Sequence, residues 1–104
     1  MRQFENVTVL AKANVYFDGK VISHTIRFSD GSRKTVGLIY PGEYTFNTDA
    51  PELMEIIAGS CRVRQKNAAD WSTYAAGQSF HVAGKSSFTI AVTDGIAEYI
   101  CSFE

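Results

Sequence analysis

The sequence predicts an all-β fold in a single domain. Short runs of strand length recur along the chain, and turn signals separate them about every 8–12 residues. No stretch shows the apolar periodicity of an amphipathic helix. A length of 104 residues is enough for one hydrophobic core and leaves little room for a second. We therefore expect a sandwich or barrel of about nine or ten short strands.

The first half of the chain reads as strands joined by glycine-containing turns. The expected strands cover residues 7–11, 13–17, 20–29 and 33–40. Asp18-Gly19 is a typical hairpin turn, and residues 29–32 form a second turn signal. We expect Tyr16 and Phe17 to cover the barrel or an interface.

The second half continues the same pattern. The expected strands cover residues 52–59, 60–66, 71–74, 79–82, 88–92 and 96–103. The segments between them are rich in glycine, asparagine and aspartate, which favour turns. The pattern therefore predicts strands throughout, without a linker or an internal repeat.

Residues 37–59 carry the main chemical clue. After Pro41-Gly42, alternation places Glu43 and Thr45 on one side of the chain and Tyr44 and Phe46 on the other. On the following run, Glu52 shares a face with apolar side chains. We expect both glutamates to face the barrel interior, where a buried charge is costly unless it is paired or used.

Composition restricts the function classes. Apolar residues make up 45% of the chain and charged residues 20%, as in an ordinary globular protein. A net charge of −1 argues against nucleic-acid binding through bulk charge. Cys61 and Cys101 lack metal-binding or redox spacing, and are expected to pack as small hydrophobic residues. No segment has the length of a membrane span or the layout of a signal peptide, so a cytoplasmic location is expected.

The spacing within residues 37–59 resembles the first motif of the cupins. Gly37 is followed after five residues by Glu43 and then Thr45, and Glu52 precedes Gly59 by six residues. Cupins usually carry two metal-binding histidines at the positions of Glu43 and Thr45. The gap before Glu52 is longer than in that pattern.

The second cupin motif is matched in part as well. Gly77 is followed by Ala83, where the family has proline, and by Phe88, where it has histidine. Three of the four positions that bind metal in cupins are thus Glu43, Thr45 and Phe88. This set is a poor ligand shell for zinc, iron or copper, so we expect no metal.

Longer segments resemble one group more closely. The chain contains ANVYFDGKV, RKTVGLIYPGEYTFNTDAPELMEIIAGS, DWSTYAAGQSF and SSFTIAV. Together these resemble the small, metal-free cupins that act as pyrimidine/purine nucleoside phosphorylases, from about residue 13 to residue 103. One departure is Val82-Ala83, where that family usually has Val-Pro.

The resemblance implies a fold, an activity and partners. The fold would be one cupin-type β-barrel (a jelly-roll sandwich) over residues 1–104, with residues 1–12 as an extension whose strand lies at a sheet edge or dimer interface. The reaction would convert nucleoside and phosphate to ribose 1-phosphate and a free purine or pyrimidine base, with broad base tolerance. The enzyme would be a homodimer without a cofactor, and phosphate would be its co-substrate.

The chemistry of phosphorolysis suggests roles for particular side chains. Glu43 and Glu52 are expected to bind ribose hydroxyls and stabilise an oxocarbenium-like transition state. Arg33 is the first candidate for phosphate, since its planar fork matches that anion, and Lys20 is a weaker one. His81 is a candidate proton donor to the leaving base. The remaining expected substrate contacts are Thr45, Met54, Phe80, Phe88 and Tyr99.

Each assignment has an ordinary structural alternative. Glu43, Glu52 and Arg33 adjoin turns and could simply be solvated. For the whole protein, the alternatives are a cupin that binds a sugar or nucleotide without catalysis, a metal-dependent cupin with unusual ligands, and a structural module. Phosphate-dependent release of a base would distinguish the phosphorylase from these three alternatives.

Overall fold

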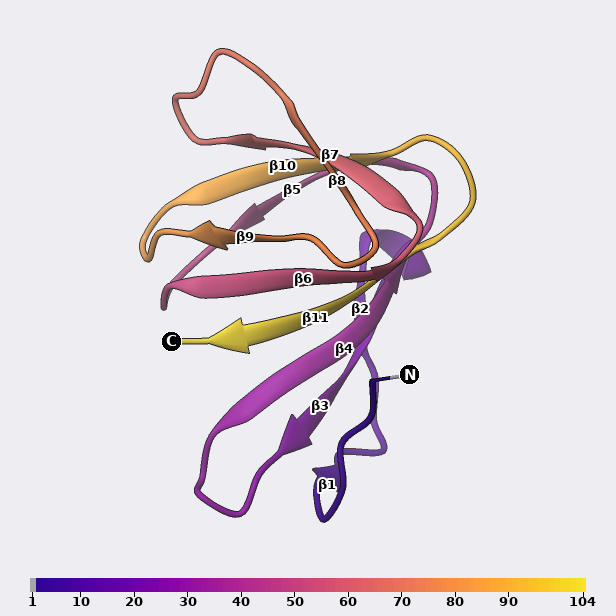
Figure 1. Cartoon of the computed structure of the whole chain (residues 1–104), viewed down its shortest axis with the longest axis vertical. Helices are drawn as coiled ribbons and strands as arrows, with labels where there is room; N and C mark the ends of the chain where they lie inside the picture. Colours follow the sequence, from indigo (N-terminus) through magenta and orange to yellow (C-terminus); the bar gives the residue numbers. More distant parts are fainter. Residues whose placement is uncertain (1) are drawn as a thin grey trace.

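A computed structural model describes residues 2–104 as two antiparallel sheets that face each other (Figure 1). The larger sheet has the order β1-β3-β4-β11-β6-β9, and β2 pairs with β3 beside β1. Its strands are β1 (Thr8–Val9), β2 (Asn14–Tyr16), β3 (Val21–Arg27), β4 (Arg33–Ile39), β6 (Glu52–Ala58), β9 (Ser79–Val82) and β11 (Ala97–Phe103). The predicted all-β, single-domain sandwich is confirmed.

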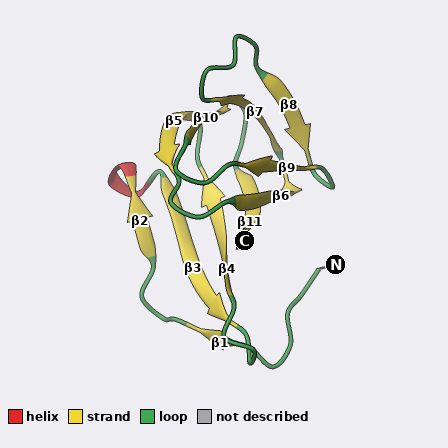
Figure 2. Ribbon diagram, turned by 90° about the vertical axis from the view of Figure 1, so that its left-hand side faces the viewer, coloured by secondary structure: helices red, strands yellow, loops and turns green. Residues whose placement is uncertain are grey.

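The smaller sheet has the order β5-β10-β7-β8. Its strands are β5 (Gly42–Asn47), β7 (Ser60–Gln65), β8 (Ser72–Ala75) and β10 (Ser87–Val92). Within the described residues the helical element is η1 (Phe17–Gly19), a single 3-10 turn that Figure 2 shows in red beside β2. No helix in residues 2–104 is long and apolar enough to cross a membrane.

The segment after Pro41 differs from the sequence-based expectation. It was expected to connect two strands, but it is itself a strand, β5, which crosses to the smaller sheet and pairs with β10. Alternation explains the difference, since Tyr44 is buried and Phe46 is half-buried while their neighbours are exposed. The apolar side chains of β5 thus complete the inner face of the smaller sheet.

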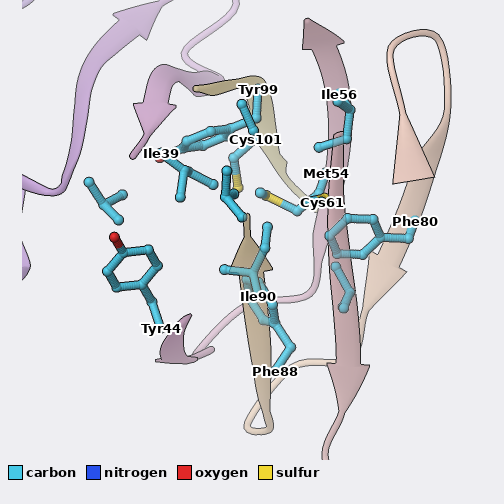
Figure 3. Close-up of a cluster of buried hydrophobic side chains, with 14 of the residues drawn as sticks. Ile39, Tyr44, Met54, Ile56, Cys61, Phe80, Phe88, Ile90, Tyr99 and Cys101 are labelled. Carbon is cyan, nitrogen blue, oxygen red and sulfur yellow. The ribbon is translucent and has the colours of Figure 1, made fainter. Parts of the chain in front are cut away.

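The core lies between the two sheets (Figure 3). Its largest fully buried side chains are Val21, Ile39, Ile56, Val82 and Ile90. Cys61 and Cys101 are buried and unpaired, as expected from the sequence. Burial raises the pKa of Cys61 to about 11, so this thiol remains protonated at neutral pH.

The N-terminal residues cross the outer face of the larger sheet. Arg2 forms an ion pair with Glu55 of β6, and the ring of Phe4 lies edge-on to Phe28, with centroids 5.5 Å apart. Strand β1 then pairs with β3 at the edge of the sheet. The inner face remains open for the site described next.

Candidate active site

A cavity of about 370 Å³ lies between the sheets, on the inner face of the larger one. Three adjacent strands, β4, β11 and β6, supply several of its polar side chains in rows. In one row, Glu52 of β6 lies opposite Phe103 of β11. In the next inward-facing row, Cys101 of β11 lies between Thr35 of β4 and Met54 of β6. The rows arise because alternate residues of a strand face the same side of a sheet.

Glu52 provides a carboxylate at the start of β6. The side chain is half-buried, and burial raises the pKa of the carboxyl group, while a hydrogen bond from Cys101 acts in the opposite direction. Burial, followed by the nearby Glu52 charge, raises the pKa of Cys101 to about 12. The thiol therefore stays protonated and is a donor for the Glu52 carboxylate.

Arg33 provides a cation at the start of β4. Its guanidinium carbon lies 4.2 Å from the ring centroid of Phe103. Within residues 2–104, ion pairs closer than 4.0 Å join Arg2 to Glu55 and His81 to Glu104, so Arg33 has no carboxylate partner. The Phe103 ring supports one face of the guanidinium, and the N–H groups along its edge remain available to an anion.

Tyr99 crosses the floor of the cavity from β11. Burial raises the pKa of its phenol to about 12, and a hydrogen bond with Ser23 acts in the opposite direction. The ring needs the glycine at position 37, because a Cβ there would lie 2.9 Å from Tyr99 Cε1 and 2.8 Å from Ser23 Cβ. Gly37 thus lets a large aromatic residue lie across β4.

Aromatic side chains form the opposite wall. Phe46 of β5 and Phe88 of β10 stack with centroids 5.8 Å apart and an angle of 25° between their planes. Tyr16 of β2 lies edge-to-face against Phe46, also with centroids 5.8 Å apart. The cavity therefore places charged groups on the larger sheet opposite an apolar wall with flat ring surfaces.

Five of the residues predicted from the sequence come together here. The cavity is lined in part by Arg33, Glu52, Met54, Phe88 and Tyr99. Their grouping agrees with the expected site, although their individual roles stay predictions. The roles proposed for them concern the phosphate, the ribose and the base.

Glu43 and Thr45 do not line the cavity, and their expected interior position is wrong. Both side chains are exposed on the outer face of β5, and Thr45 Oγ1 lies 2.9 Å from Thr89 Oγ1. Tyr44 is only 5% exposed, because β5 packs its aromatic side chains into the core and leaves its polar side chains in solvent.

Three other predicted contacts also lie away from the cavity. Phe80 is buried in the core, with its ring centroid 4.7 Å from that of Tyr74. His81 is exposed on β9, where Nδ1 lies 3.2 Å from a carboxylate oxygen of Glu104. Lys20 is exposed directly after η1. None of these side chains lines the cavity in which the other five meet.

Several other residues that line the cavity were not expected from the sequence. These are Tyr16, Ser23, Thr35, Phe46, Asn47, Asp49, Cys101 and Phe103. Alternation from Val21 would have placed Ser23 inward, but the polar residues of that strand carried no chemical signal of their own. Cys101 and Phe103 belong to a strand that is apolar on both faces, so alternation alone could not orient them.

The donor set of the described residues bears on metal binding. No group of three or more histidine, cysteine, aspartate or glutamate side chains that could hold a metal ion occurs in residues 2–104. The absence of a metal cofactor itself stays a prediction from the sequence.

Comparisons with known proteins agree on one family. The family profile described as "Pyrimidine/purine nucleoside phosphorylase" matches residues 11–103. A protein of that name from Cupriavidus metallidurans is 58% identical over 103 residues, which cover 99% of both chains. A crystal structure of a protein of unknown function from Acinetobacter sp. ADP1 has a TM-score of 0.95 and 49% identity, covering 98% of both chains.

A more distant structural likeness concerns the fold alone. A variant of oxalate decarboxylase from Bacillus subtilis aligns with a TM-score of 0.74 at 12% identity, over 100% of this chain and 30% of that one. Together with the two facing sheets, this likeness supports the cupin-type barrel expected from the sequence.

Proposed function

The chain belongs to the pyrimidine/purine nucleoside phosphorylase family, and we propose that its cavity is where a nucleoside is cleaved by phosphate. The enzyme is a nucleoside phosphorylase, with nucleosides and phosphate as its substrates. The observation that carries the site assignment is that one cavity contains both Arg33, whose guanidinium has no carboxylate partner, and Glu52, whose carboxylate is half-buried. In our proposal these two groups hold the two substrates.

Arg33 binds the phosphate in this proposal. A guanidinium without a carboxylate partner can offer two parallel N–H donors to two phosphate oxygens. The exposed position of Arg33 leaves it accessible to an anion arriving from solvent. Cation–π contact with Phe103 holds the guanidinium flat, which lowers the entropy that it loses on binding.

Glu52 binds the ribose in this proposal. As the glycosidic bond lengthens, positive charge develops on the sugar ring, and a nearby carboxylate stabilises it. A hydrogen bond from a ribose hydroxyl to Glu52 strengthens at the same time. The Cys101 thiol orients the carboxylate without competing for a proton, because its pKa is about 12.

The reaction then follows as a displacement at the anomeric carbon. A phosphate oxygen forms a bond to C1′, the bond from C1′ to the base nitrogen breaks, and its electron pair leaves with the base. The base takes up the proton that hydrogen phosphate gives up when its oxygen becomes the ester oxygen. The products are ribose 1-phosphate and a free base. The apolar wall, which includes Phe46 and Phe88, contacts the flat face of the base, so we propose that purines and pyrimidines are both accepted.

Base release from a mixture of uridine and inosine, with and without phosphate, tests this function. We expect both bases to appear by chromatography only when phosphate is present. Release without phosphate would indicate a hydrolase, and no release from folded protein would favour a cupin that only binds its ligand.

A matched pair of arginine variants tests the phosphate site. Arg33→Ala should raise the KM for phosphate by about 10- to 100-fold, as expected for loss of charge-assisted hydrogen bonds. The KM for uridine should change little. Arg64→Ala, which removes an exposed arginine from the outer face of β7, should behave like the wild type. Equal losses for both substrates in Arg33→Ala would refute the assignment.

We propose that two copies of the chain associate through the outer face of the larger sheet. A shallow groove there includes the apolar side chains of Phe4, Ile26, Val36, Leu38 and Ile57. Two-fold pairing of one such face buries it in both copies at once. Light scattering at micromolar concentration should give the mass of a dimer, and a monomer mass would contradict this. Leu38→Glu should shift the protein to the monomer.

We also propose that the enzyme uses no cofactor and is located in the cytoplasm. The donor set of the cavity suits phosphate and sugar hydroxyls better than a metal ion. Cys61 and Cys101 are unpaired, which is typical of a reducing compartment. A stoichiometric metal found by elemental analysis would refute the absence of a cofactor. Cell fractionation tests the location, and the protein should appear in the cytoplasmic fraction.

A further inference from the structure

The turn between β2 and β3 has an unusual backbone. Phe17 and Asp18 have φ angles of 52° and 56°, and Gly19 follows with φ of 90°. Glycine adopts such angles freely, but a phenylalanine with its backbone in the left-handed region is rare and strained. Strain of this kind is retained only where the surrounding structure requires it, so the environment of Phe17 is informative.

The strained turn brings aromatic side chains of the larger sheet against the smaller one. The ring centroid of Phe17 lies 5.0 Å from that of Tyr44 and 5.3 Å from that of Phe46, both on β5. Figure 2 shows η1 at the end of β2, next to β5. The preceding residue, Tyr16, packs edge-to-face on Phe46 with an interplanar angle of 82°. We call Tyr16, Phe17 and Phe46 the aromatic corner.

Two residues of the aromatic corner, Tyr16 and Phe46, line the cavity. Glu52 and Tyr99 line the same cavity. Tyr16 is 45% exposed, so much of its ring surface is available to a ligand. The pKa of Tyr99 is raised chiefly by burial and further by the nearby Tyr16 and Glu52. The corner therefore adjoins the groups proposed to bind the sugar.

We propose that Tyr16 stacks on the base of the bound nucleoside and determines how tightly purines and pyrimidines bind. This inference rests on the proposed function, and it gives a specific role in base binding to Tyr16, the last residue of β2. The edge-to-face contact holds the Tyr16 ring nearly perpendicular to Phe46, so the two rings form a right-angled corner. A flat heterocycle can lie against the Tyr16 ring in this corner, with its edge toward Phe46, while its sugar reaches toward Glu52.

Stacking of this kind predicts a particular selectivity. Every base has a π face, so an aromatic ring accepts all of them without reading their hydrogen-bonding edges. A purine has two fused rings and covers more of Tyr16 than a pyrimidine does. Removal of the Tyr16 ring should therefore weaken the binding of inosine more than the binding of uridine.

Four proteins test the proposal: the wild type, Tyr16→Ala, Tyr16→Phe and Val15→Ala. Tyr16→Ala should raise the KM for inosine by about 5- to 100-fold, the range expected for one lost aromatic stacking contact. The increase for uridine should be smaller, and the KM for phosphate should not change. Tyr16→Phe keeps the ring and should remain close to the wild type. Val15→Ala alters the neighbouring residue, which is 60% exposed, and should have no effect.

Two outcomes would overturn the proposal. Unchanged KM values in Tyr16→Ala would show that its ring does not contact the base. Equal losses in Tyr16→Ala and Tyr16→Phe would show that the hydroxyl group acts instead of the ring. Thermal unfolding of each variant checks its folding, and Tyr16→Leu, which keeps apolar packing on Phe46, replaces Tyr16→Ala if the latter does not fold.

Failure of the proposed function is distinguishable from failure of this inference. If the wild type releases no base with phosphate, the phosphorylase assignment fails by itself. Calorimetric titration of inosine into the wild type and Tyr16→Ala then decides the role of Tyr16. Weaker binding by the variant supports stacking, and equal binding or no binding to either protein refutes it.

Discussion

Replacement of Gly37 by alanine would test how closely the strands around the cavity approach one another. Gly37 lies on β4, opposite Ser23 of β3 and Tyr99 of β11. A Cβ atom at this position would lie 2.5 Å from the carbonyl oxygen of Ile22, 2.8 Å from Ser23 Cβ and 2.9 Å from Tyr99 Cε1. The Tyr99 ring can move, but the carbonyl cannot move without disturbing the pairing of β3 with β4.

Two effects of opposite sign compete in this substitution. Gly37 is not in the left-handed region, so alanine adopts its backbone angles without strain, and the loss of unfolded-state entropy alone would stabilise the protein by about 0.4–1 kcal/mol. Overpacking of a filled site costs about 1–3 kcal/mol. The three contacts below 3.0 Å place Gly37→Ala in the upper part of that range, so steric repulsion should exceed the entropic gain.

Thermal unfolding followed by circular dichroism measures the outcome. A net loss of about 1–2 kcal/mol should lower the Tm by roughly 4–15 °C for a domain of this size. Phosphorolysis should also slow, because the displaced Tyr99 ring moves into the cavity. Gly77→Ala serves as the control: a Cβ there meets nothing within 4 Å, but φ is +90°, so only backbone strain is added. Gly77→Ala should keep full activity.

A Gly37→Ala protein as stable as the wild type, or more stable, would contradict this prediction. That result would mean that the entropic term dominates and that β3, β4 and β11 are not in close contact at this point. Normal activity in a clearly destabilised variant would instead separate Tyr99 from substrate binding.

Two further predictions concern titratable groups in and near the cavity. Burial raises the pKa of Glu52 above its value in the unfolded chain, so folding favours the protonated carboxyl group. The free energy of unfolding therefore falls as the pH rises from below the unfolded pKa through the folded pKa, because the folded protein must then bury a charge. Glu52→Gln should therefore raise the Tm at pH 7 but not at a pH below the unfolded pKa, while kcat/KM falls; an unchanged kcat/KM would exclude Glu52 from the reaction. Cys61 and Cys101, with pKa values of about 11 and 12, should resist thiol reagents in the native protein at pH 8 and react only after unfolding. Rapid labelling of the native protein would contradict their burial.

Alternation predicted most of the fold correctly, because one buried face leaves a clear pattern in strands such as β7 and β9. It was misapplied at Glu43, which was assigned to the interior as a candidate catalytic carboxylate at a cupin ligand position, although Tyr44 and Phe46 are the apolar side of the same strand. Arg33 and Glu52 were selected for their chemistry, a guanidinium for phosphate and a carboxylate for the ribose, and both line the cavity, while their roles stay predictions.

The other cavity residues could not be predicted for two physical reasons. Strand β11 buries Ile100 as well as Tyr99 and Cys101, so its sequence does not reveal which face is turned inward. The position of Tyr16 depends on the left-handed conformation of Phe17, which runs against the intrinsic preference of phenylalanine. Only the packing of both sheets determines that conformation.

The groups proposed to bind phosphate and ribose lie on strands and not on long loops, and this has a consequence for altering the substrate range. Arg33, Glu52 and Tyr99 each occupy an inward position of a sheet that also forms the core. Loop grafting, the usual route to new specificity in barrel enzymes, would leave these groups untouched. A directed-evolution library would have to vary inward residues, where each change in selectivity also alters core packing, so useful variants should need compensating substitutions on the facing strand.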